Sequence, residues 1–245
     1  ADIIVDGKAV KWTGVSGGGF KACDVPGRVR KITRYSFQRP WSEGYRLASG
    51  FDDWRKGAAP AVRLAEAPSG SFLPRRSSLP KLAVRQIQKW VAEGSWTPNP
   101  EAKVWKDRSV VNISPQLIGY PENELEMAPA LELQKFTATH RLVQRDPSEQ
   151  PVLKAGQSMT ADFGTNLTGF IGVEVECQET TTLYLTFDEF LQESGRTDFL
   201  RLGCANAIRL DLTPGAYSFE SAEPYTFRVL EAVCPKGSCT IKRAN

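Results

Sequence analysis

The sequence predicts an all-β protein built from two antiparallel β-sandwiches. Three observations support this prediction: apolar and polar residues alternate over short segments, turn signals separate these segments at short intervals, and the clear strands follow one another without an intervening helix. Regular short strands of this kind are typical of sandwiches and jelly rolls.

The alternation is clearest in the second half of the chain. Within the segment 169–177, Val173 and Val175 share one face. Glu174 and Glu176 alternate with them, so we expect these carboxylates on the solvent side of a sheet that is buried on the other side. The other segments with this pattern are 135–143, 182–187, 207–212, 216–220 and 225–233.

We divide the chain into an N-terminal sandwich over 1–80, which lacks some opening strands, and a second, jelly-roll-like sandwich over 81–245. The Ser-, Pro- and Gly-rich segment 69–80 marks the link between them. The next segment, 82–94, has two interpretations. Its apolar residues recur at helical spacing and Gly94 would stop a helix, but the same residues also suit a strand.

Composition excludes several classes of function. Of 245 residues, 41% are hydrophobic and 24% are charged, as in a globular protein with its own core. The net charge of +3 is small and the basic residues are scattered, so we expect no nucleic-acid partner. No run approaches the ~18–20 apolar residues of a membrane span. The sequence has one histidine, His140, so we expect no metal site and no cofactor.

The chain begins at Ala1 without a methionine, which fits removal of a signal peptide or a start chosen in cloning. The sequence holds five cysteines, so at least one is unpaired within a monomer. Cys177 occupies a buried strand position and is predicted to be a buried thiol. Cys234 and Cys239 flank a tight loop, and a disulfide between them is as compatible with the sequence as two separate thiols.

Few residues are candidates for catalysis. Glycoside hydrolysis needs two carboxyl groups at a fixed separation, but the neighbours Asp188 and Glu189 point to opposite sides of an extended chain. His140 lies among apolar strand residues and no serine or cysteine nucleophile motif accompanies it, which favours a hydrogen-bonded structural histidine. We therefore assign no catalytic residue to this chain.

One group of residues is a candidate for carbohydrate binding. Aromatic faces pack on the C–H face of a sugar and carboxylates accept from its hydroxyls. The alternative, favoured by the usual burial of tryptophan, is that the rings fill the first sandwich or its contact with the second. The candidate residues are Trp41, Tyr45, Asp52, Asp53 and Trp54.

The glycines of the segment 162–172 are interpreted as structural. Gly164 and Gly169 are expected to turn the backbone with positive φ where strands begin. A phosphate-binding loop would need GxxxxGK spacing and a following helix, which this segment lacks.

Several motifs, taken in order, resemble those of bacterial α-L-rhamnosidase-type glycoside hydrolases. FLPRRSSLPKL (72–82) resembles the "PR-x-x-x-P-L" link, and DFGTNLTGFIGVEVEC (162–177) resembles the "DFG-x-N-x-x-G" strand. TFDEFL (186–191) and PYTFRVLEAV (224–233) resemble the two strands that follow. FQRPWSEGYRL with DDW (37–54) is similar to a loop of the family's first sandwich.

The resemblance implies a galactose-binding-like sandwich and a second β-domain, which in the family precede a catalytic (α/α)6 barrel. It also favours the strand interpretation of 82–94. The implied parent protein is a bacterial, periplasmic or extracellular hydrolase of terminal α-L-rhamnosyl linkages, inverting with two carboxylates. Those carboxylates lie in the barrel, so none is carried over to this sequence.

We therefore expect a non-catalytic sandwich region that packs on the barrel and makes weak contact with carbohydrate. A stand-alone carbohydrate-binding module is one alternative, and a secreted structural or adhesive β-protein is another. In each case the chain alone is expected not to be catalytic.

Overall fold

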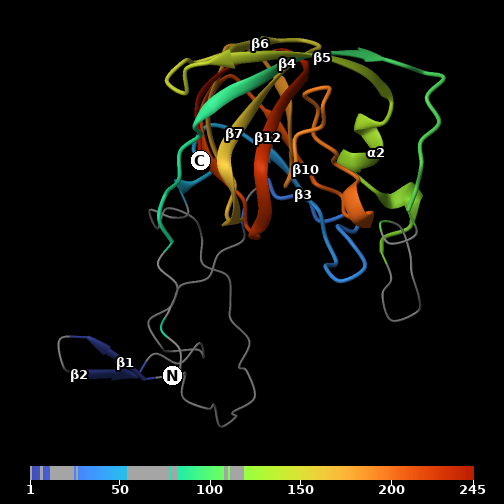
Figure 1. Cartoon of the computed structure of the whole chain (residues 1–245). Coiled ribbons are helices and arrows are strands. Elements are labelled where there is room, and N and C mark those ends of the chain that lie inside the picture. The colour runs from blue at the N-terminus through green and yellow to red at the C-terminus, as the bar shows by residue number, and fades with distance from the viewer. Residues whose placement is uncertain are drawn as a thin grey trace. The chain divides into compact units, whose positions relative to one another are not determined.

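A computed structural model gives the architecture of two compact units. The smaller unit comprises 1–26 and 50–83, and the larger comprises 27–49 and 84–245. In the smaller unit, β1 (Asp2–Val5) pairs antiparallel with β2 (Lys8–Lys11) (Figure 1). The residues that the structure describes are 2–5, 8–11, 25, 27–53, 78, 82–107, 110 and 119–245.

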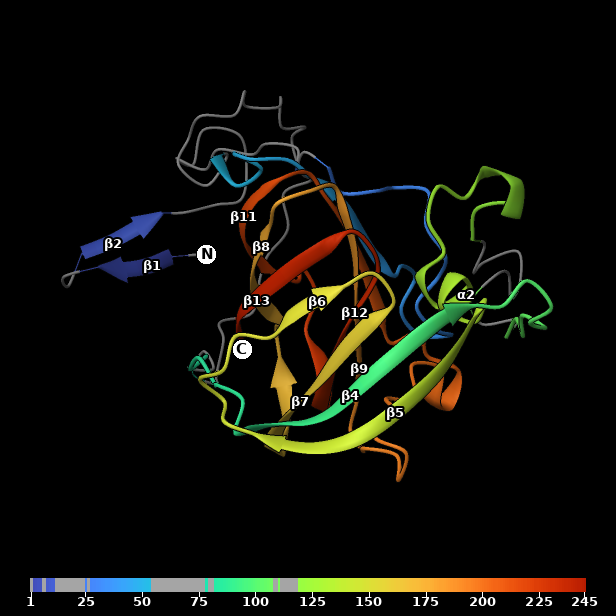
Figure 2. The same cartoon turned by 90° about the horizontal axis from the view of Figure 1, so that it is seen from above.

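The larger unit is a sandwich of a seven-stranded and a four-stranded sheet, in the strand orders β3-β10-β9-β12-β7-β4-β5 and β11-β8-β13-β6. Figure 2 shows the smaller sheet lying over the larger one. Pairing is antiparallel except between β3 and β10. The strands are β3 (Glu43–Leu47), β4 (Lys89–Pro98), β5 (Phe136–Arg145), β6 (Val152–Lys154), β7 (Gln157–Gly169), β8 (Gly172–Cys177), β9 (Thr181–Asp188), β10 (Ala207–Leu212), β11 (Gly215–Glu220), β12 (Tyr225–Lys236) and β13 (Ser238–Ala244).

This architecture confirms the all-β sandwich class. The predicted alternation also holds in β8, where Val173 and Val175 are each 1% exposed. On the opposite face of the strand, Glu174 and Glu176 form ion pairs with Arg243 and Lys242 of β13. The apolar face of the small sheet is buried because the large sheet covers it.

The other face of the large sheet is covered by short helices and loops. Helix α2 (Pro129–Leu133) packs there together with the chain around Phe199. Two 3-10 turns, η2 (Glu122–Glu124) and η3 (Arg201–Gly203), lie in the connections. The buried cluster on this face consists of Trp96, Val110, Ala130, Leu133, Tyr184, Phe199, Ala205, Ala207 and Val233.

The segment 82–94 contains no helix, and its second half belongs to strand β4. Residues 82–87 have no regular structure, and β4 begins at Lys89. The pairing of β4 with both neighbours shifts register between Trp90 and Ala92. Three consecutive buried residues result, and this irregularity breaks the period of two that a regular strand would show.

Residues 27–49 lie in the larger unit, whereas the predicted division at residue 80 places them in the first domain. The reason is that β3 pairs in parallel with β10, which sequence patterning cannot reveal. The prediction of an incomplete first sandwich over 1–80 falls largely on residues that the structure does not describe, and it stays a prediction.

The Asp162-Phe163-Gly164 motif has a structural role. Gly164 has a φ of 78°, as expected, whereas Gly169 has no positive φ and ends β7. The Asp162 carboxylate accepts from the Gly164 N–H at 2.7 Å and from two Arg228 nitrogens at 2.9 Å. Burial raises the pKa of Asp162, but the hydrogen bonds and the Arg228 charge outweigh it, so the pKa lies below its ordinary value.

A buried carboxylate holds the edge strand β3 in place. Glu43, 1% exposed, accepts from the hydroxyl groups of Tyr45 and Tyr225. It also accepts from the backbone N–H groups of Ala222 (2.9 Å) and Glu223 (3.0 Å). The carboxylate thus satisfies four donors and fastens β3 to the turn that precedes β12.

We expect Glu43→Ala to lower the free energy of unfolding by at least ~3 kcal/mol, because hydrogen bonds to a charged group contribute about 1.5–3 kcal/mol each. Urea unfolding followed by circular dichroism measures this change. The matched control is Glu220→Ala on the exposed side of β11, expected within about 0.5 kcal/mol of the wild type. Equal effects of the two substitutions would contradict the anchoring role of Glu43.

Candidate functional site

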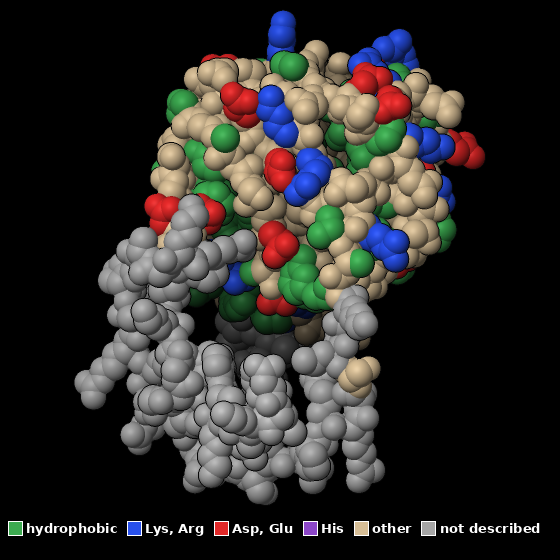
Figure 3. Space-filling model, turned by 90° about the vertical axis from the view of Figure 1, so that its left-hand side faces the viewer, with side chains coloured by type: hydrophobic (Ala, Val, Ile, Leu, Met, Phe, Trp, Pro, Cys, Tyr) green, Lys and Arg blue, Asp and Glu red, His purple; other side chains and the backbone are tan. Residues whose placement is uncertain are grey.

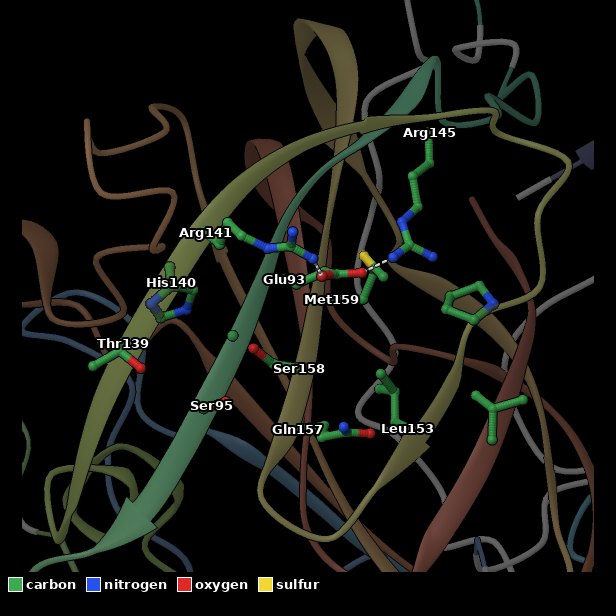
Figure 4. A pocket seen from close by; sticks show the side chains of 13 residues that line it. Glu93, Ser95, Thr139, His140, Arg141, Arg145, Leu153, Gln157, Ser158 and Met159 are labelled. Atoms are coloured by element: carbon green, nitrogen blue, oxygen red, sulfur yellow. Dashed lines mark hydrogen bonds and ion pairs between the residues drawn. The ribbon is translucent and has the colours of Figure 1, made fainter.

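A cleft of 410 Å³ opens beside β4, β5, β6 and β7 (Figure 4). Its volume lies within the range of ~300–1,000 Å³ that is usual for small-molecule sites. The residues that line it are Glu93, Gly94, Ser95, Thr139, His140, Arg141, Arg145, Pro151, Val152, Leu153, Gln157, Ser158 and Met159.

A carboxylate between two guanidinium groups is the charged centre of this cleft. Glu93 of β4 lies directly opposite Arg141 of the edge strand β5, and the two side chains form an ion pair. Arg145, four residues further along β5, binds the other oxygen of Glu93, as the dashed lines of Figure 4 show. Opposite charges on facing positions of neighbouring strands attract one another, which stabilises this pairing.

The two arginines retain hydrogen-bonding capacity toward a ligand. The Arg141 side chain is 75% exposed and that of Arg145 is 39% exposed. A guanidinium carries five N–H donors in a planar fork, and only some of them reach Glu93 or, from Arg145, Glu149. Both side chains therefore keep exposed surface beside the cleft.

The rest of the cleft combines polar and apolar groups. Ser95, Thr139 and Gln157 contribute hydroxyl and amide groups, and the exposed side chain of Val152 contributes apolar surface. None of the lining residues is Trp, Tyr or Phe. The arrangement suits a ligand with several hydroxyl groups and a small apolar face.

A second cluster of polar side chains lies inside the fold, around Glu231 of the central strand β12. Its carboxylate accepts from His140 Nε2 (2.7 Å), Ser158 Oγ (2.7 Å) and Trp96 Nε1 (3.2 Å). The other oxygen accepts from the Thr197 hydroxyl at 3.0 Å. The side chains of His140 and Glu231 are 1% and 0% exposed.

This cluster is structural and not a catalytic triad. Ser158 donates to Glu231 and makes no hydrogen bond to His140, so no base is placed to activate its hydroxyl. Burial raises the pKa of Glu231, but the hydrogen bond and the charge of His140, together with the hydrogen bonds of Ser158 and Thr197, outweigh this effect. The pKa of Glu231 therefore lies below its ordinary value, and the ionised form is the stable one.

The structure places the predicted carbohydrate-binding residues in different surroundings. Trp41 is half-buried, with its ring centroid 5.1 Å from that of Tyr120. Tyr45 is 4% exposed and donates to Glu43, so its ring offers no face to a sugar.

Asp52 and Asp53 belong to the smaller unit, whereas Trp41 and Tyr45 belong to the larger. Trp54 lies outside the described residues. The five-residue surface therefore stays a prediction, and the larger unit holds only its half-buried Trp41 and its buried Tyr45.

The described cysteines, Cys177, Cys204, Cys234 and Cys239, are free thiols. Cys177 is buried, as predicted, and Cys234 and Cys239 are not joined to each other. Cys23 lies outside the described residues.

Charged side chains of both signs are interspersed on the face of the molecule in Figure 3. Among the described residues, no group of three or more His, Cys, Asp or Glu side chains is placed to hold a metal ion. None of the helices in the described part of the chain is long and apolar enough to cross a membrane.

Sequence reasoning missed the cleft. Glu93 precedes Arg141 by 48 positions and Arg145 by 52 positions in the sequence, and helix α2 lies between their strands. Opposite charges on two adjacent strands are a useful signal only when their register is known, and here an irregularity shifts it.

No family model matches this sequence, and no curated protein does. Parts of solved rhamnosidases do resemble the structure. A GH78 family rhamnosidase of Bacillus sp. GL1 is 22% identical with a TM-score of 0.42, over 53% of this chain and 15% of that chain. A rhamnosidase from Klebsiella oxytoca is 16% identical with a TM-score of 0.36, over 66% and 28%.

An α-L-rhamnosidase from Aspergillus terreus is 17% identical with a TM-score of 0.28, over 59% of this chain and 17% of that chain. This chain thus spans between 15% and 28% of the length of these three structures.

The lowered pKa of Glu231 predicts how stability depends on pH. Because the pKa is lower in the folded than in the unfolded state, ionised Glu231 contributes stability above its ordinary value of 4.5. That contribution is lost as the pH falls through the folded pKa. We expect Glu231→Gln to be less stable than the wild type by ~1–3 kcal/mol at neutral pH, with the difference shrinking in acid.

Urea unfolding of both proteins from neutral pH to well below 4.5 measures this difference. Glu220→Gln, on an exposed position, is the control and should follow the wild type throughout. A constant difference between wild type and Glu231→Gln at every pH would show that the ionised carboxylate is not responsible.

Proposed function

We propose that this chain is a non-catalytic β-sandwich region of a glycoside hydrolase of the α-L-rhamnosidase type, and that its cleft contacts carbohydrate. The observation that carries the proposal is the cleft centred on Glu93, Arg141 and Arg145. The ordered motifs between residues 72 and 233, including the structural Asp162–Arg228 pair, support the choice of parent enzyme.

Carbohydrate is the ligand class that suits the lining best. Sugar hydroxyls both donate and accept hydrogen bonds, and their geometry matches planar carboxylate and guanidinium groups. Glu93 accepts, the arginines donate, and Ser95 and Thr139 can do both. The exposed side chain of Val152 offers apolar surface to the C–H face of a pyranose ring.

The surroundings of the carboxylates support a non-catalytic role. Glu93 is the single carboxylate among the lining residues, whereas glycoside hydrolysis uses two. Glu43 and Glu231 are buried and hydrogen-bonded, so no substrate reaches them. Asp188 is 1% exposed, and burial raises its pKa.

In this proposal the partner is a catalytic barrel of the same parent protein, and the location is periplasmic or extracellular. A stand-alone carbohydrate-binding module would use the same cleft and differs only in having no barrel. A native mass in the source well above 27.1 kDa, measured by immunoblotting, distinguishes the first case from the second.

We expect the chain to bind rhamnose, galactose or fragments of plant polysaccharide with Kd values of about 1 mM or lower, a strength that titration calorimetry detects. Arg141→Ala removes donors from the cleft and should weaken binding by about tenfold or more, which corresponds to ~1.4 kcal/mol.

Arg243→Ala is the matched control. Arg243 is a half-exposed arginine of β13 that pairs with Glu174 of β8, and neither residue lines the cleft. This substitution should leave the affinity unchanged. If titration calorimetry detects no binding of any of these sugars at millimolar concentration, the proposal of carbohydrate binding is wrong. If both substitutions weaken binding equally, the sugar does not bind in this cleft.

The isolated chain is expected not to release nitrophenol from an aryl α-L-rhamnoside above the rate of buffer, since Glu93 is the single carboxylate among the residues that line the cleft. Release at rates typical of enzymes, of about 1 per second or more, would show that the chain is catalytic. Glu93→Gln would then test whether the cleft is responsible.

A further inference from the structure

Three buried cysteines from three different strands lie close together, and the thiol of Cys239 contacts the other two. Cys177 ends β8, Cys239 lies near the start of β13 and Cys234 lies near the end of β12. Cys177 is 2% exposed, Cys239 is 3% exposed and Cys234 is 0% exposed. Neither the cleft nor the proposed function uses them.

Cys177 and Cys239 are directly opposite each other in the antiparallel pair of β8 and β13. Residues in this relation have Cα atoms about 4.5–5.5 Å apart and place their side chains on the same face of the sheet. A disulfide requires a Cα separation of about 4.4–6.8 Å, so this pair meets the requirement without rearrangement of the strands.

Cys234 is less suited to pair with Cys239, although it is closer in sequence. It belongs to the large sheet, whereas Cys239 belongs to the small one. The Cys234 thiol donates to the carbonyl oxygens of Lys236 (3.5 Å) and Gly237 (3.6 Å) within the turn that joins the strands. Gly237 has a φ of 81°, which fixes the tight course of this turn.

The thiols also influence one another's ionisation. Hydrogen bonds with Cys177 and Cys234, together with burial, raise the pKa of Cys239. The hydrogen bond with Cys239 lowers the pKa of Cys177, against the effect of burial. Cys177 is therefore the thiol of this pair that ionises first, and a thiolate is the attacking species in disulfide exchange.

We propose that Cys177 and Cys239 form a cross-strand disulfide when the chain folds in the presence of a low-molecular-weight disulfide such as oxidised glutathione. The Cys177 thiolate attacks the glutathione disulfide, forms a mixed disulfide and releases one glutathione thiolate. The Cys239 sulfur, having lost its proton to solvent, then attacks the Cys177 sulfur and releases the second glutathione. Two cysteine thiols are oxidised and one glutathione disulfide is reduced to two thiols.

The burial of both sulfur atoms determines when the disulfide can form. In the folded sandwich neither thiol is open to glutathione, so exchange takes place during folding or when β13 opens. Once formed, the bond closes a loop of about 60 residues that contains β9 to β12, and it restricts the unfolded chain more than a short loop would.

Peptide mapping of the full chain tests the proposal, because trypsin separates all the cysteines. Cys177 lies in 155–196, Cys234 in 229–236 and Cys239 in 237–242, while Cys204 lies in 202–209 and Cys23 in 22–28. The reduced chain is refolded in a glutathione redox buffer, its remaining thiols are alkylated, and it is digested without reductant. Mass spectrometry is expected to find 155–196 linked to 237–242.

A link between 229–236 and 237–242, or recovery of all three peptides alkylated, would overturn the proposal. Cys234→Ser should keep the expected link and Cys204→Ser is the matched control, whereas Cys177→Ala should abolish it. In the wild type, reduction should also lower the midpoint of thermal unfolding, and this shift should vanish in Cys177→Ala. If Cys177→Ala does not fold, the wild-type map alone decides the outcome.

Discussion

The buried carboxylate of Glu231 is the interaction on which the outer part of the large sheet depends. It lies in the central strand β12, yet its hydrogen bonds reach Ser158 in β7, Trp96 in β4 and His140 in the edge strand β5. A buried ionised group is costly unless each of its oxygens is satisfied, so these strands must keep their spacing and register. A Cβ atom at Gly94 would lie 2.8 Å from His140 Nε2, which shows how tightly the strands pack here.

The cleft follows from the same constraint. Successive side chains of a strand point to opposite faces, so holding His140 against Glu231 turns its neighbour Arg141 to the other face. There Arg141 meets Glu93, its partner across the pairing of β4 and β5. The buried cluster around Glu231 and the ion pairs of Glu93 thus depend on the same register of β4 and β5. We therefore expect a substitution in the buried cluster to alter the cleft as well.

Much of the larger unit could be predicted from alternation alone. The segments 182–187, 207–212 and 225–233 match β9, β10 and β12 closely, because apolar residues recur with a period of two along one face of each strand, although both faces of β9 and much of β12 are buried. Alternation alone left helix and strand both open for 82–94, because the period of two breaks at the three consecutive buried residues of β4. Prediction failed for β3, whose partner lies more than 150 residues away in the chain.

The sequence by itself determined the all-β class, the solvent-facing side of β8, the burial of Cys177 and the positive φ of Gly164, since each depends on local alternation or on the freedom of glycine. Only the tertiary structure decided which residues meet. It buried Tyr45 against Glu43, made Arg141 and Arg145 the partners of Glu93, and set Cys177 opposite Cys239. Strand order and register depend on contacts between distant segments, and local pattern carries no record of them.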